Sequence, residues 1–231
     1  SRGLGDVYKR QDVIFIGVGT PEKIDGSANL DYVYNVADDI VDNINKDCLI
    51  VIKSTVPIGT NFKIEKYIKE KLNGKYKIEI ASNPEFLAQG TAVRDTLEAQ
   101  RIVIGTHSTW AEHILKTIYS KFEKSVLVCT DINSAEMIKY ASNDFLALKI
   151  SYINEIANLC EILGANIEDV TKGMGLDNRI GNKFLNAGIG YGGSCFPKDT
   201  KALHWLAKLN NCELKTIKAA IDVNKNQKLK L

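Results

Sequence analysis

The sequence has no apolar stretch that approaches the roughly 18 residues of a membrane span, and no basic cluster with interleaved aromatic residues. These absences argue against a membrane protein and give no support for nucleic acid as a partner. The five cysteines are scattered without a CxxC pair, and the three histidines are isolated. We therefore expect no metal site and no disulfide framework, and the expected compartment is a reducing cytoplasm.

The first eleven residues, SRGLGDVYKRQ, resemble the translation of a sequencing adapter, and we set them aside as a non-native leader. The leader holds three basic residues and one acidic residue, so the rest of the chain has 27 of each and the net charge of +2 falls to zero. The remaining length of about 220 residues suits one large domain or two small ones. With the leader set aside, the native sequence is expected to begin at Asp12, inside an element, so we expect the chain to be a piece of a longer protein.

Short β-branched runs alternate with helical patterns in the first part of the chain. The expected strands are VIFIGV, CLIVIKSTVP, KIEIASNPEFL, RIVIGT and SVLVCTD. This alternation is typical of βα units and a mostly parallel sheet, and continuously apolar strands suit a sheet that is covered on both faces. The sequence therefore predicts an α/β region over residues 12–131, with buried, inert thiols at Cys48 and Cys129.

The second part of the chain is predicted to be helical, from residue 132 to 231. A helix of about 30 residues is expected from Ser134, as N-cap, to Gly164, and its apolar residues go nearly all the way round. Such a helix should be largely buried, with Cys160 as another core thiol. Further helices are expected at IEDVTKGM, from Pro197 to about Leu209, and at ELKTIKAAIDVNKNQK.

Polar residues follow three successive expected strands. They are Gly-Thr-Pro at 19–21, Lys-Ser-Thr at 53–55 and Asn-Pro-Glu at 83–85. Ordinary turn chemistry explains any one of these ends. Ligands of doubly wound sheets bind outside the carboxyl ends of the strands, so three polar ends on one edge favour a binding crevice.

The glycine-rich stretch GIGYGGSC leads to Cys195. Residues 188–193 match G-x-G-x-x-G, but a dinucleotide fingerprint needs a preceding strand, and this stretch lies in the helical part. We interpret it as a loop that lets the backbone approach a bound group closely. Cys195 lies just before Pro197 and Lys198 at an expected helix N-terminus, where the helix dipole and the lysine favour the nucleophilic thiolate.

Lys139 and Asn143 are four residues apart on the expected long helix, so they lie on one of its faces. Lysines are usually exposed, but this helix is apolar nearly all round. A buried pair would need a polar partner, such as a substrate oxygen or Asp199. The spacing alone leaves both a solvated stripe and a buried pair open.

Six segments together resemble the UDP-glucose 6-dehydrogenase family, and they occur in that family's order. They are GTPEKIDGSANLDYV, KSTVPIGT, SNPEFLAQGTAVRDT, RIVIG, EMIKYASNDFLALKISYINE and RIGNKFLNAGIGYGGSCFPKD. The resemblance covers essentially all of residues 12–231. It implies the second half of a Rossmann-like parallel sheet, a long central helix and an all-helical middle domain. The implied activity is the NAD-dependent, four-electron oxidation of UDP-glucose to UDP-glucuronate.

The resemblance also implies roles for single residues. Cys195 matches the nucleophile, which would carry a thiohemiacetal and then a thioester, and Lys139 matches the lysine that stabilises oxyanion charge. The other catalytic matches are Asn143, Asp199, Thr55 and Glu85, the last as general base in thioester hydrolysis. Cofactor contacts are implied for Thr20, Thr55, Gln89 and Lys198. Substrate contacts are implied for Glu85, Phe184, Leu185, Asn186, Gly188, Gly192 and Arg179, which some relatives insert into the neighbouring subunit's site.

Two departures from the family pattern affect these expectations. Many relatives have a glutamate where this chain has Gln89, which can bind but cannot act as a base. The family's first βαβ unit, with the dinucleotide glycines, and its C-terminal UDP-binding domain have no counterpart here. We therefore expect residues 12–131 to be a partial NAD-binding domain, and the chain alone not to turn over.

Three alternatives stay open. The substrate could instead be GDP-mannose or UDP-N-acetylmannosamine. The chain could be a non-catalytic module that forms a homodimer through the long helix. A cysteine hydrolase would need a positioned histidine, and the nearest, His204, lies nine residues after Cys195 with no reason to expect a contact.

Overall fold

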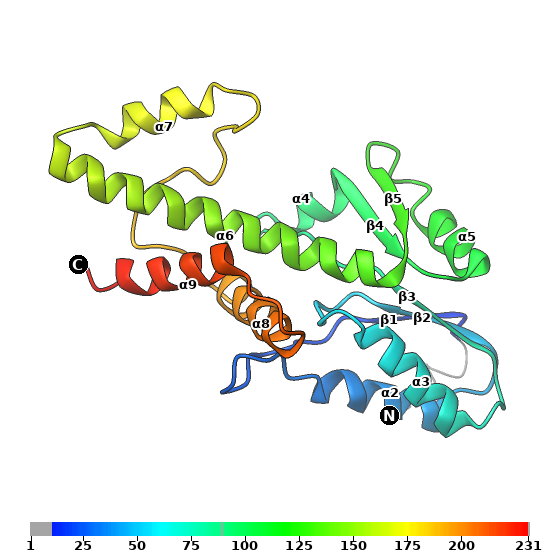
Figure 1. Cartoon of the computed structure of the whole chain (residues 1–231). Coiled ribbons are helices and arrows are strands. Elements are labelled where there is room, and N and C mark those ends of the chain that lie inside the picture. The colour runs from blue at the N-terminus through cyan, green and yellow to red at the C-terminus, as the bar shows by residue number, and fades with distance from the viewer. Residues whose placement is uncertain (1–10, 89, 231) are drawn as a thin grey trace. The chain divides into compact units, whose positions relative to one another are not determined.

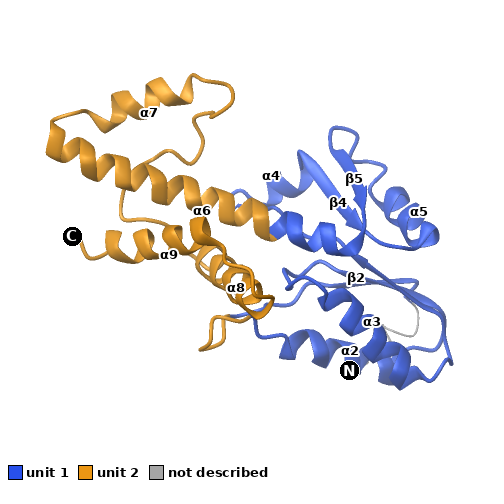
Figure 2. Ribbon diagram, viewed as in Figure 1, with its two compact units in different colours: residues 1–21, 28–139 blue, residues 22–27, 140–231 orange. Residues whose placement is uncertain are grey.

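The computed structural model describes residues 11–88 and 90–230, and its contacts divide the chain into two compact units (Figure 2). Unit 1 comprises the residues up to Pro21 together with Ala28–Lys139. Unit 2 comprises Glu22–Ser27 and the chain from Tyr140 onward. The boundary between Lys139 and Tyr140 falls inside the long helix α6 (Ile132–Leu163), so this helix contributes residues to both units.

Unit 1 is the predicted α/β region, and all five expected strands form. Its elements are β1 (Val13–Ile16), α2 (Asp31–Asn43), β2 (Cys48–Ile52), α3 (Thr60–Leu72), β3 (Ile78–Ser82), α4 (Ala92–Leu97), β4 (Arg101–Gly105), α5 (Thr109–Ile118) and β5 (Val126–Thr130), followed by the start of α6 (Figure 1). The short helix α4 was not predicted from the sequence. It has no buried residue, so it leaves no apolar pattern to detect.

The sheet has the order β1-β2-β3-β4-β5 and is mostly parallel, as predicted. Strands β1, β2 and β3 pair in parallel, and so do β4 and β5. The junction between β3 and β4 is antiparallel, through the pair Ser82 and Gly105, which the sequence analysis did not predict. Parallel neighbours need a packed crossover, and the connection between these strands offers only the unburied helix α4.

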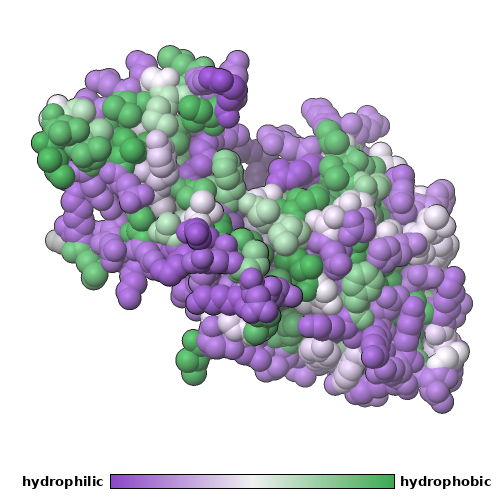
Figure 3. Space-filling model, in the orientation of Figure 1, coloured by the Kyte–Doolittle hydropathy of each residue, from purple (hydrophilic) through white to green (hydrophobic). Residues whose placement is uncertain are grey.

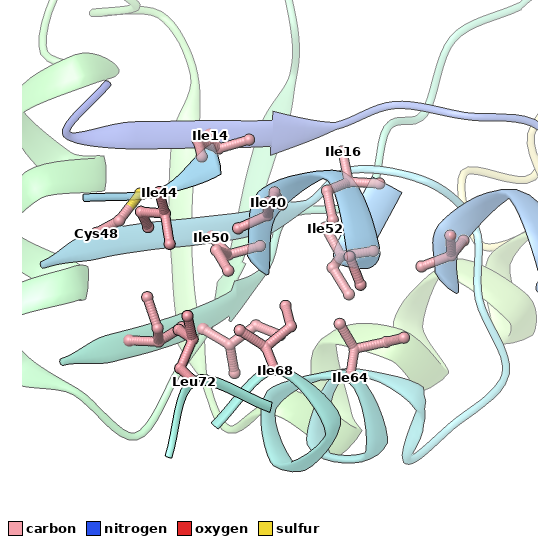
Figure 4. Packing of buried hydrophobic residues seen from close by; sticks show 14 of the residues in the cluster. Ile14, Ile16, Ile40, Ile44, Cys48, Ile50, Ile52, Ile64, Ile68 and Leu72 are labelled. Atoms are coloured by element: carbon pink, nitrogen blue, oxygen red, sulfur yellow. The ribbon is translucent and has the colours of Figure 1, made fainter. Parts of the chain in front are cut away.

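Two apolar layers cover the two faces of the sheet. Helices α2 and α3 pack on one face (Figure 1), where isoleucines of β1, α2, β2 and α3 point toward one another (Figure 4). On the other face, α5 packs against alternate residues of β2, β3 and β4. Strand β2 is buried along its whole length, and Ile50 and Val51 show the alternation between the two layers. This two-sided burial is what the continuously apolar runs predicted.

Two of the three expected core thiols are buried. Cys48 lies in the core, where burial raises the pKa of its thiol to about 11, and Cys160 is buried on α6. The prediction for Cys129 was wrong, because this side chain is exposed. It belongs to β5, the last strand of the described sheet, on which Val126 is also exposed.

Unit 2 is helical, as predicted. It contains the rest of α6 and the helices α7 (Ile167–Gly175), α8 (Phe196–Leu209) and α9 (Lys215–Gln227). Helix α6 begins at Ile132, three residues before the start that an N-cap at Ser134 predicted, because the Asp131 carboxylate accepts the N–H of Ser134 at 2.9 Å and also its hydroxyl. Gly164 follows the last residue of α6 with a φ of +72°, which confirms the predicted end.

The expectation that the long helix is largely buried was wrong. Large apolar side chains of α6 are exposed, among them Phe145 (60%), Tyr152 (48%), Leu159 (50%) and Ile162 (79%). Figure 3 shows hydrophobic residues gathered at the surface where α6 ends and α7 begins. Across residues 11–88 and 90–230, no helix combines the length and apolar character needed to cross a membrane.

Candidate active site

The polar ends of β1, β2 and β3 meet at one edge of the sheet, as predicted. The buried hydroxyl of Thr20 donates a hydrogen bond to the backbone oxygen of Thr55 at 2.7 Å. The Lys53 ammonium donates to the Asn83 side-chain oxygen at 3.3 Å, which joins the second strand end to the third. Parallel strands place their carboxyl ends on the same edge, so this convergence follows from the topology.

A partly buried ion pair lies at the third strand end. Lys139 Nζ lies 3.0 Å from Glu85 Oε1, and the side chains are 4% and 27% exposed. The sequence left both an exposed and a buried Lys139 open, and for a buried lysine we expected Asp199 or a substrate oxygen as the partner. The structure buries the lysine and pairs it with Glu85. The other Glu85 oxygen accepts the backbone N–H of Leu87 at 2.6 Å, so both carboxylate oxygens are engaged.

Lys53 is a further charged residue at this site, and the sequence placed it in a polar strand end without assigning it a role of its own. Burial lowers the pKa of its ammonium below the ordinary value, Glu85 opposes this change, and Lys139 adds to it. Two ammonium groups therefore act on Glu85, and the cluster favours an additional anion. The position of Lys53 directly after a strand, beside Thr55, was the signal that could have identified it.

Glu136 fixes the start of α6, the part of the helix that carries Lys139. Its side chain is buried, and its carboxylate accepts the backbone N–H groups of Gly59 at 2.6 Å and Asn61 at 2.9 Å. It also accepts the Asn61 side-chain amide at 2.7 Å. These donors belong to the N-terminus of α3, whose first N–H groups have no partner within the helix. Burial raises the pKa of Glu136, and the hydrogen bonds partly offset this rise.

We expect Glu136→Gln to destabilise the chain by about 2 kcal/mol. The substitution removes the negative charge, and the new side-chain NH2 group would face the N–H donors of Gly59 and Asn61, to which it cannot bond. Urea unfolding measures this loss. The matched control is Glu112→Gln, which changes an exposed i,i+4 pair with Lys116 on α5 and should leave the unfolding midpoint nearly unchanged. Equal midpoints for the two variants would contradict the role given to Glu136.

In unit 2, Asn143 and Asp199 form a buried hydrogen-bonded pair. The Asn143 amide donates to Asp199 Oδ2 at 2.6 Å, and the other Asp199 oxygen accepts from Lys198. Asp199 is fully buried and Asn143 nearly so. The sequence analysis named all three residues, and the structure brings them together. Lys139 and Asn143 lie one turn apart on α6, but Lys139 binds Glu85 and Asn143 binds Asp199.

Asp144 is a buried carboxylate that the sequence analysis missed. It is 1% exposed, and neither of its oxygens has a hydrogen-bond partner within the described residues. Burial raises the pKa of this carboxyl to about 7, and the negative charge of Asp199 adds to the rise. An acidic residue inside an apolar helical run was the available sequence signal. A buried carboxylate without partners is favoured in its protonated form.

Cys195 occupies the N-cap position of α8, which begins at Phe196, one residue before the predicted start. Its thiol is exposed and lies 3.8 Å from the Ser194 hydroxyl. Four residues later, the backbone N–H of Asp199 bonds to the Cys195 carbonyl at 2.9 Å, which is the first turn of α8. An accessible thiol therefore stands at a helix N-terminus, as the sequence predicted.

The other predicted substrate residues lie on the loop before Cys195. Leu185 is buried, Asn186 is exposed, and Phe184 has a φ of +64°, a conformation that is uncommon for a residue with a side chain. Gly188 and Gly192 have no neighbouring atom within 4 Å of the place where a Cβ would lie, so a bound group has room to approach their backbone.

The remaining predicted residues are placed as follows. Arg179 is 89% exposed in its side chain and pairs with Asp177 at 2.6 Å. Gln89 lies outside the described residues. The unit 1 residues Thr20, Thr55, Glu85 and Lys139 form one group, and the unit 2 residues around Asp199 form a second group.

The fold and these two groups of polar residues indicate the class of α/β proteins that bind nucleotides. A mostly parallel sheet that gathers polar strand ends at its carboxyl edge is typical of α/β proteins that bind nucleotides. The helical unit adds a reactive residue type, an exposed cysteine, at a helix N-terminus.

Comparison with known proteins identifies the family. Residues 4–123 match the NAD binding domain of the UDP-glucose/GDP-mannose dehydrogenase family, and residues 133–226 match its central domain. The chain therefore belongs to the UDP-glucose/GDP-mannose dehydrogenase family.

Individual relatives agree with this assignment. The chain is 52% identical, over 94% of its length, to UDP-glucose 6-dehydrogenase from Rickettsia conorii, of which it covers 49%. It is 52% identical, over 95% of its length, to UDP-glucose 6-dehydrogenase YwqF from Bacillus subtilis, of which it covers 50%. A solved UDP-glucose dehydrogenase from Pyrobaculum islandicum superposes with a TM-score of 0.93 and 39% identity, covering 98% of this chain and 53% of that one. The chain thus spans about half the length of these relatives.

Proposed function

We propose that this chain is the catalytic part of an NAD-dependent enzyme that oxidises the C6 alcohol of UDP-glucose to the carboxylate of UDP-glucuronate. Relatives about half identical to it carry the name UDP-glucose 6-dehydrogenase. The observation that carries the proposal is the exposed thiol of Cys195 at the start of α8, in the same helix as the buried Asp199. Thiols in such places are suited to nucleophilic catalysis.

The residues at the end of β1 fit a dinucleotide. Gly17 and Gly19 have no neighbouring atom within 4 Å of a Cβ position, so the backbone there is open to a ligand. Thr20 and Thr55 lie next to this opening and are hydrogen-bonded to each other, so we assign them to NAD binding. Lys198 is a further proposed cofactor contact, as is Gln89. Two molecules of NAD, bound in turn, would supply the acceptors for the two hydrides that this oxidation releases.

The chemistry requires a nucleophile between two oxidations. The C6 alcohol loses a hydride and a proton and becomes an aldehyde. The Cys195 thiolate adds to the aldehyde carbon, and the resulting thiohemiacetal loses a second hydride to give a thioester. Water then cleaves the thioester, which releases the carboxylate and restores the thiol. Covalent attachment divides one difficult oxidation into easier steps.

Charged residues have proposed roles in these steps. Lys139 stabilises negative charge that develops on the C6 oxygen, with the help of Asn143. Glu85 is the general base that activates water for thioester hydrolysis, and its ion pair with Lys139 holds it in place. Asp199 orients water or accepts a proton, and its hydrogen bond from Asn143 fixes its direction.

The loop before Cys195 is the proposed contact surface for the UDP-sugar. We assign substrate contacts to Phe184, Leu185, Asn186, Gly188 and Gly192. The open backbone positions at the two glycines support close approach of a nucleotide sugar. GDP-mannose remains an alternative substrate because the family name includes it, and UDP-N-acetylmannosamine remains the second alternative.

The deciding measurement counts NADH. It needs a full-length protein that contains this chain, since the chain spans about half of its relatives' length. With UDP-glucose as substrate, the proposed route yields two NADH per sugar. One NADH per sugar would exclude the thioester route, and turnover only with one of the other two nucleotide sugars would reassign the substrate.

A second candidate function is assembly without catalysis. The exposed apolar residues Tyr152, Leu159, Ile162 and Leu163 on α6 favour it, because such a surface on a helix is often buried by a partner. We propose that a second copy of the chain covers this surface and that Arg179 then reaches the partner's site. Sedimentation velocity at increasing concentration should detect the homodimer, and a monomer throughout would contradict it.

Cytoplasmic localisation stays a prediction.

A further inference from the structure

Helix α9 holds the backbone of the loop that precedes Cys195. Asn224, which is 6% exposed, accepts the backbone N–H of Tyr191 at 2.6 Å. Its amide nitrogen donates to the backbone oxygen of Tyr191 at 3.0 Å. One side-chain amide therefore satisfies both backbone groups of Tyr191, as a neighbouring strand would.

Gly188 is held in the same way, by two helices. Its N–H bonds to the side-chain oxygen of Asn154 on α6 at 2.7 Å, and its carbonyl accepts from Gln227 on α9 at 3.0 Å. Gln227 is itself held by the Asn158 amide at 2.9 Å. We call Asn154, Asn224 and Gln227 the amide clamp. The clamp engages all four backbone polar groups of Gly188 and Tyr191.

The clamp explains one of the loop glycines. Gly190 has a φ of +103°, and a Cβ built on it would overlap the Oδ1 atom of Asn224. Gly193 also has a positive φ, +78°, but no atom lies within 4 Å of its Cβ position. The sequence analysis interpreted the glycines as room for a bound group. At Gly190 the group that comes close is the side chain of Asn224.

An aromatic contact links the clamp to the cysteine. The buried Tyr191 ring packs edge-on against Phe196, with ring centroids 6.2 Å apart, and Phe184 packs against Phe196 from 6.1 Å. Phe196 is the residue after Cys195 and the first residue of α8. Because Asn224 fixes Tyr191 and Tyr191 packs on Phe196, the place of the Cys195 sulfur depends on α9.

We propose that Asn224 is a positioning residue for Cys195. It acts through the Tyr191 backbone and the Tyr191–Phe196 contact, and it does not touch the substrate. The consequence for turnover rests on the proposed function. The consequence for the exposure and reactivity of the thiol does not, because thiol labelling needs neither substrate nor cofactor.

The test compares Asn224→Ala with Asn226→Ala in the full-length protein. Asn226 is exposed, two residues further along α9, and controls for the loss of an asparagine from this helix. The readout is the rate of iodoacetamide labelling of Cys195 divided by that of Cys212, the other exposed cysteine of unit 2. We expect Asn224→Ala to change this ratio several-fold and to lower kcat by about tenfold or more, since small misplacements of reacting groups have large effects. Asn226→Ala should change neither quantity.

The results separate the two proposals. An Asn224→Ala protein with lower thermal stability but an unchanged labelling ratio would overturn the positioning role. A changed ratio in a protein whose wild type has no dehydrogenase activity would support the positioning role and reject the proposed function. If Asn224→Ala does not fold, Asn224→Asp replaces it in the test. Aspartate keeps the acceptor for the Tyr191 N–H and loses the donor to the Tyr191 carbonyl, so the labelling ratio should still differ from that of the wild type, and an unchanged ratio would overturn the positioning role.

Glycine substitutions test the contact itself. Gly190→Ala and Gly193→Ala both place alanine at a positive φ, which is unfavourable by about 1 kcal/mol or more. Only Gly190→Ala also collides with Asn224, so combining it with Asn224→Ala should recover part of its loss in thermal stability. The loss from Gly193→Ala should be the same with and without Asn224. Equal behaviour of the two glycines would overturn the clamp geometry.

Discussion

Replacing Cys195 by serine should lower the rate of UDP-glucuronate formation by at least about a thousandfold in a full-length protein that contains this chain. A serine hydroxyl ionises far less readily than a thiol, so the aldehyde would gain no covalent partner and the second oxidation would not begin. The fold should be unaffected, because the side chain is exposed and makes no cap hydrogen bond. The assay is the initial rate of UDP-glucuronate formation with UDP-glucose and NAD.

Cys212 provides the matched control for this substitution. It is also an exposed cysteine of unit 2, and it lies beyond the end of α8 with no proposed role. Cys212→Ser should keep the full rate. If Cys195→Ser kept a rate within tenfold of the wild type, the thioester mechanism would be wrong even for an enzyme of the proposed specificity.

Replacing Asp144 by asparagine should remove a large pH dependence of stability. Burial raises the pKa of this carboxyl from 3.8 to about 7 in the folded chain. The folded state therefore binds the proton more tightly than the unfolded state. This contribution to stability is complete below the unfolded value and is lost as the pH rises through the folded value.

The expected size follows from linkage. From about pH 5 to about pH 8, the wild type should lose about 3 kcal/mol of unfolding free energy relative to Asp144→Asn. Asparagine mimics the neutral acid and cannot ionise, so the variant lacks this loss. Urea unfolding at several pH values measures the difference, in which the contributions of all other groups cancel.

An exposed aspartate controls for the substitution. Asp169 lies in the first turn of α7, and Asp169→Asn should give a stability curve parallel to that of the wild type. Parallel curves for Asp144→Asn as well would mean that the carboxyl is not held in its protonated form. The partnerless burial of Asp144 would then have to be relieved by a rearrangement on ionisation.

Several parts of the structure were determined by local sequence alone. The apolar runs predicted all five strands, and the reason is clearest for β2, which is covered on both faces and buried at every residue. The glycine and proline positions predicted the end of α6 and the start of α8 to within one residue, since they act through the backbone of the same segment. The predicted start of α8 in turn placed Cys195 at a helix N-terminus. The meeting of the strand ends followed from the parallel order.

Only the tertiary structure decided which distant residues meet. The ammonium of Lys139 binds Glu85, 54 positions away, and Asn224 binds a backbone 33 positions away. No local pattern encodes such pairs, because each depends on how elements far apart in the sequence pack. The same reason explains the missed roles of Glu136 and Asp144, whose burial comes from neighbouring elements. Cys129 shows that an apolar run does not guarantee burial. It lies on β5, the last strand of the described sheet, and its side chain is exposed although its sequence suits a core.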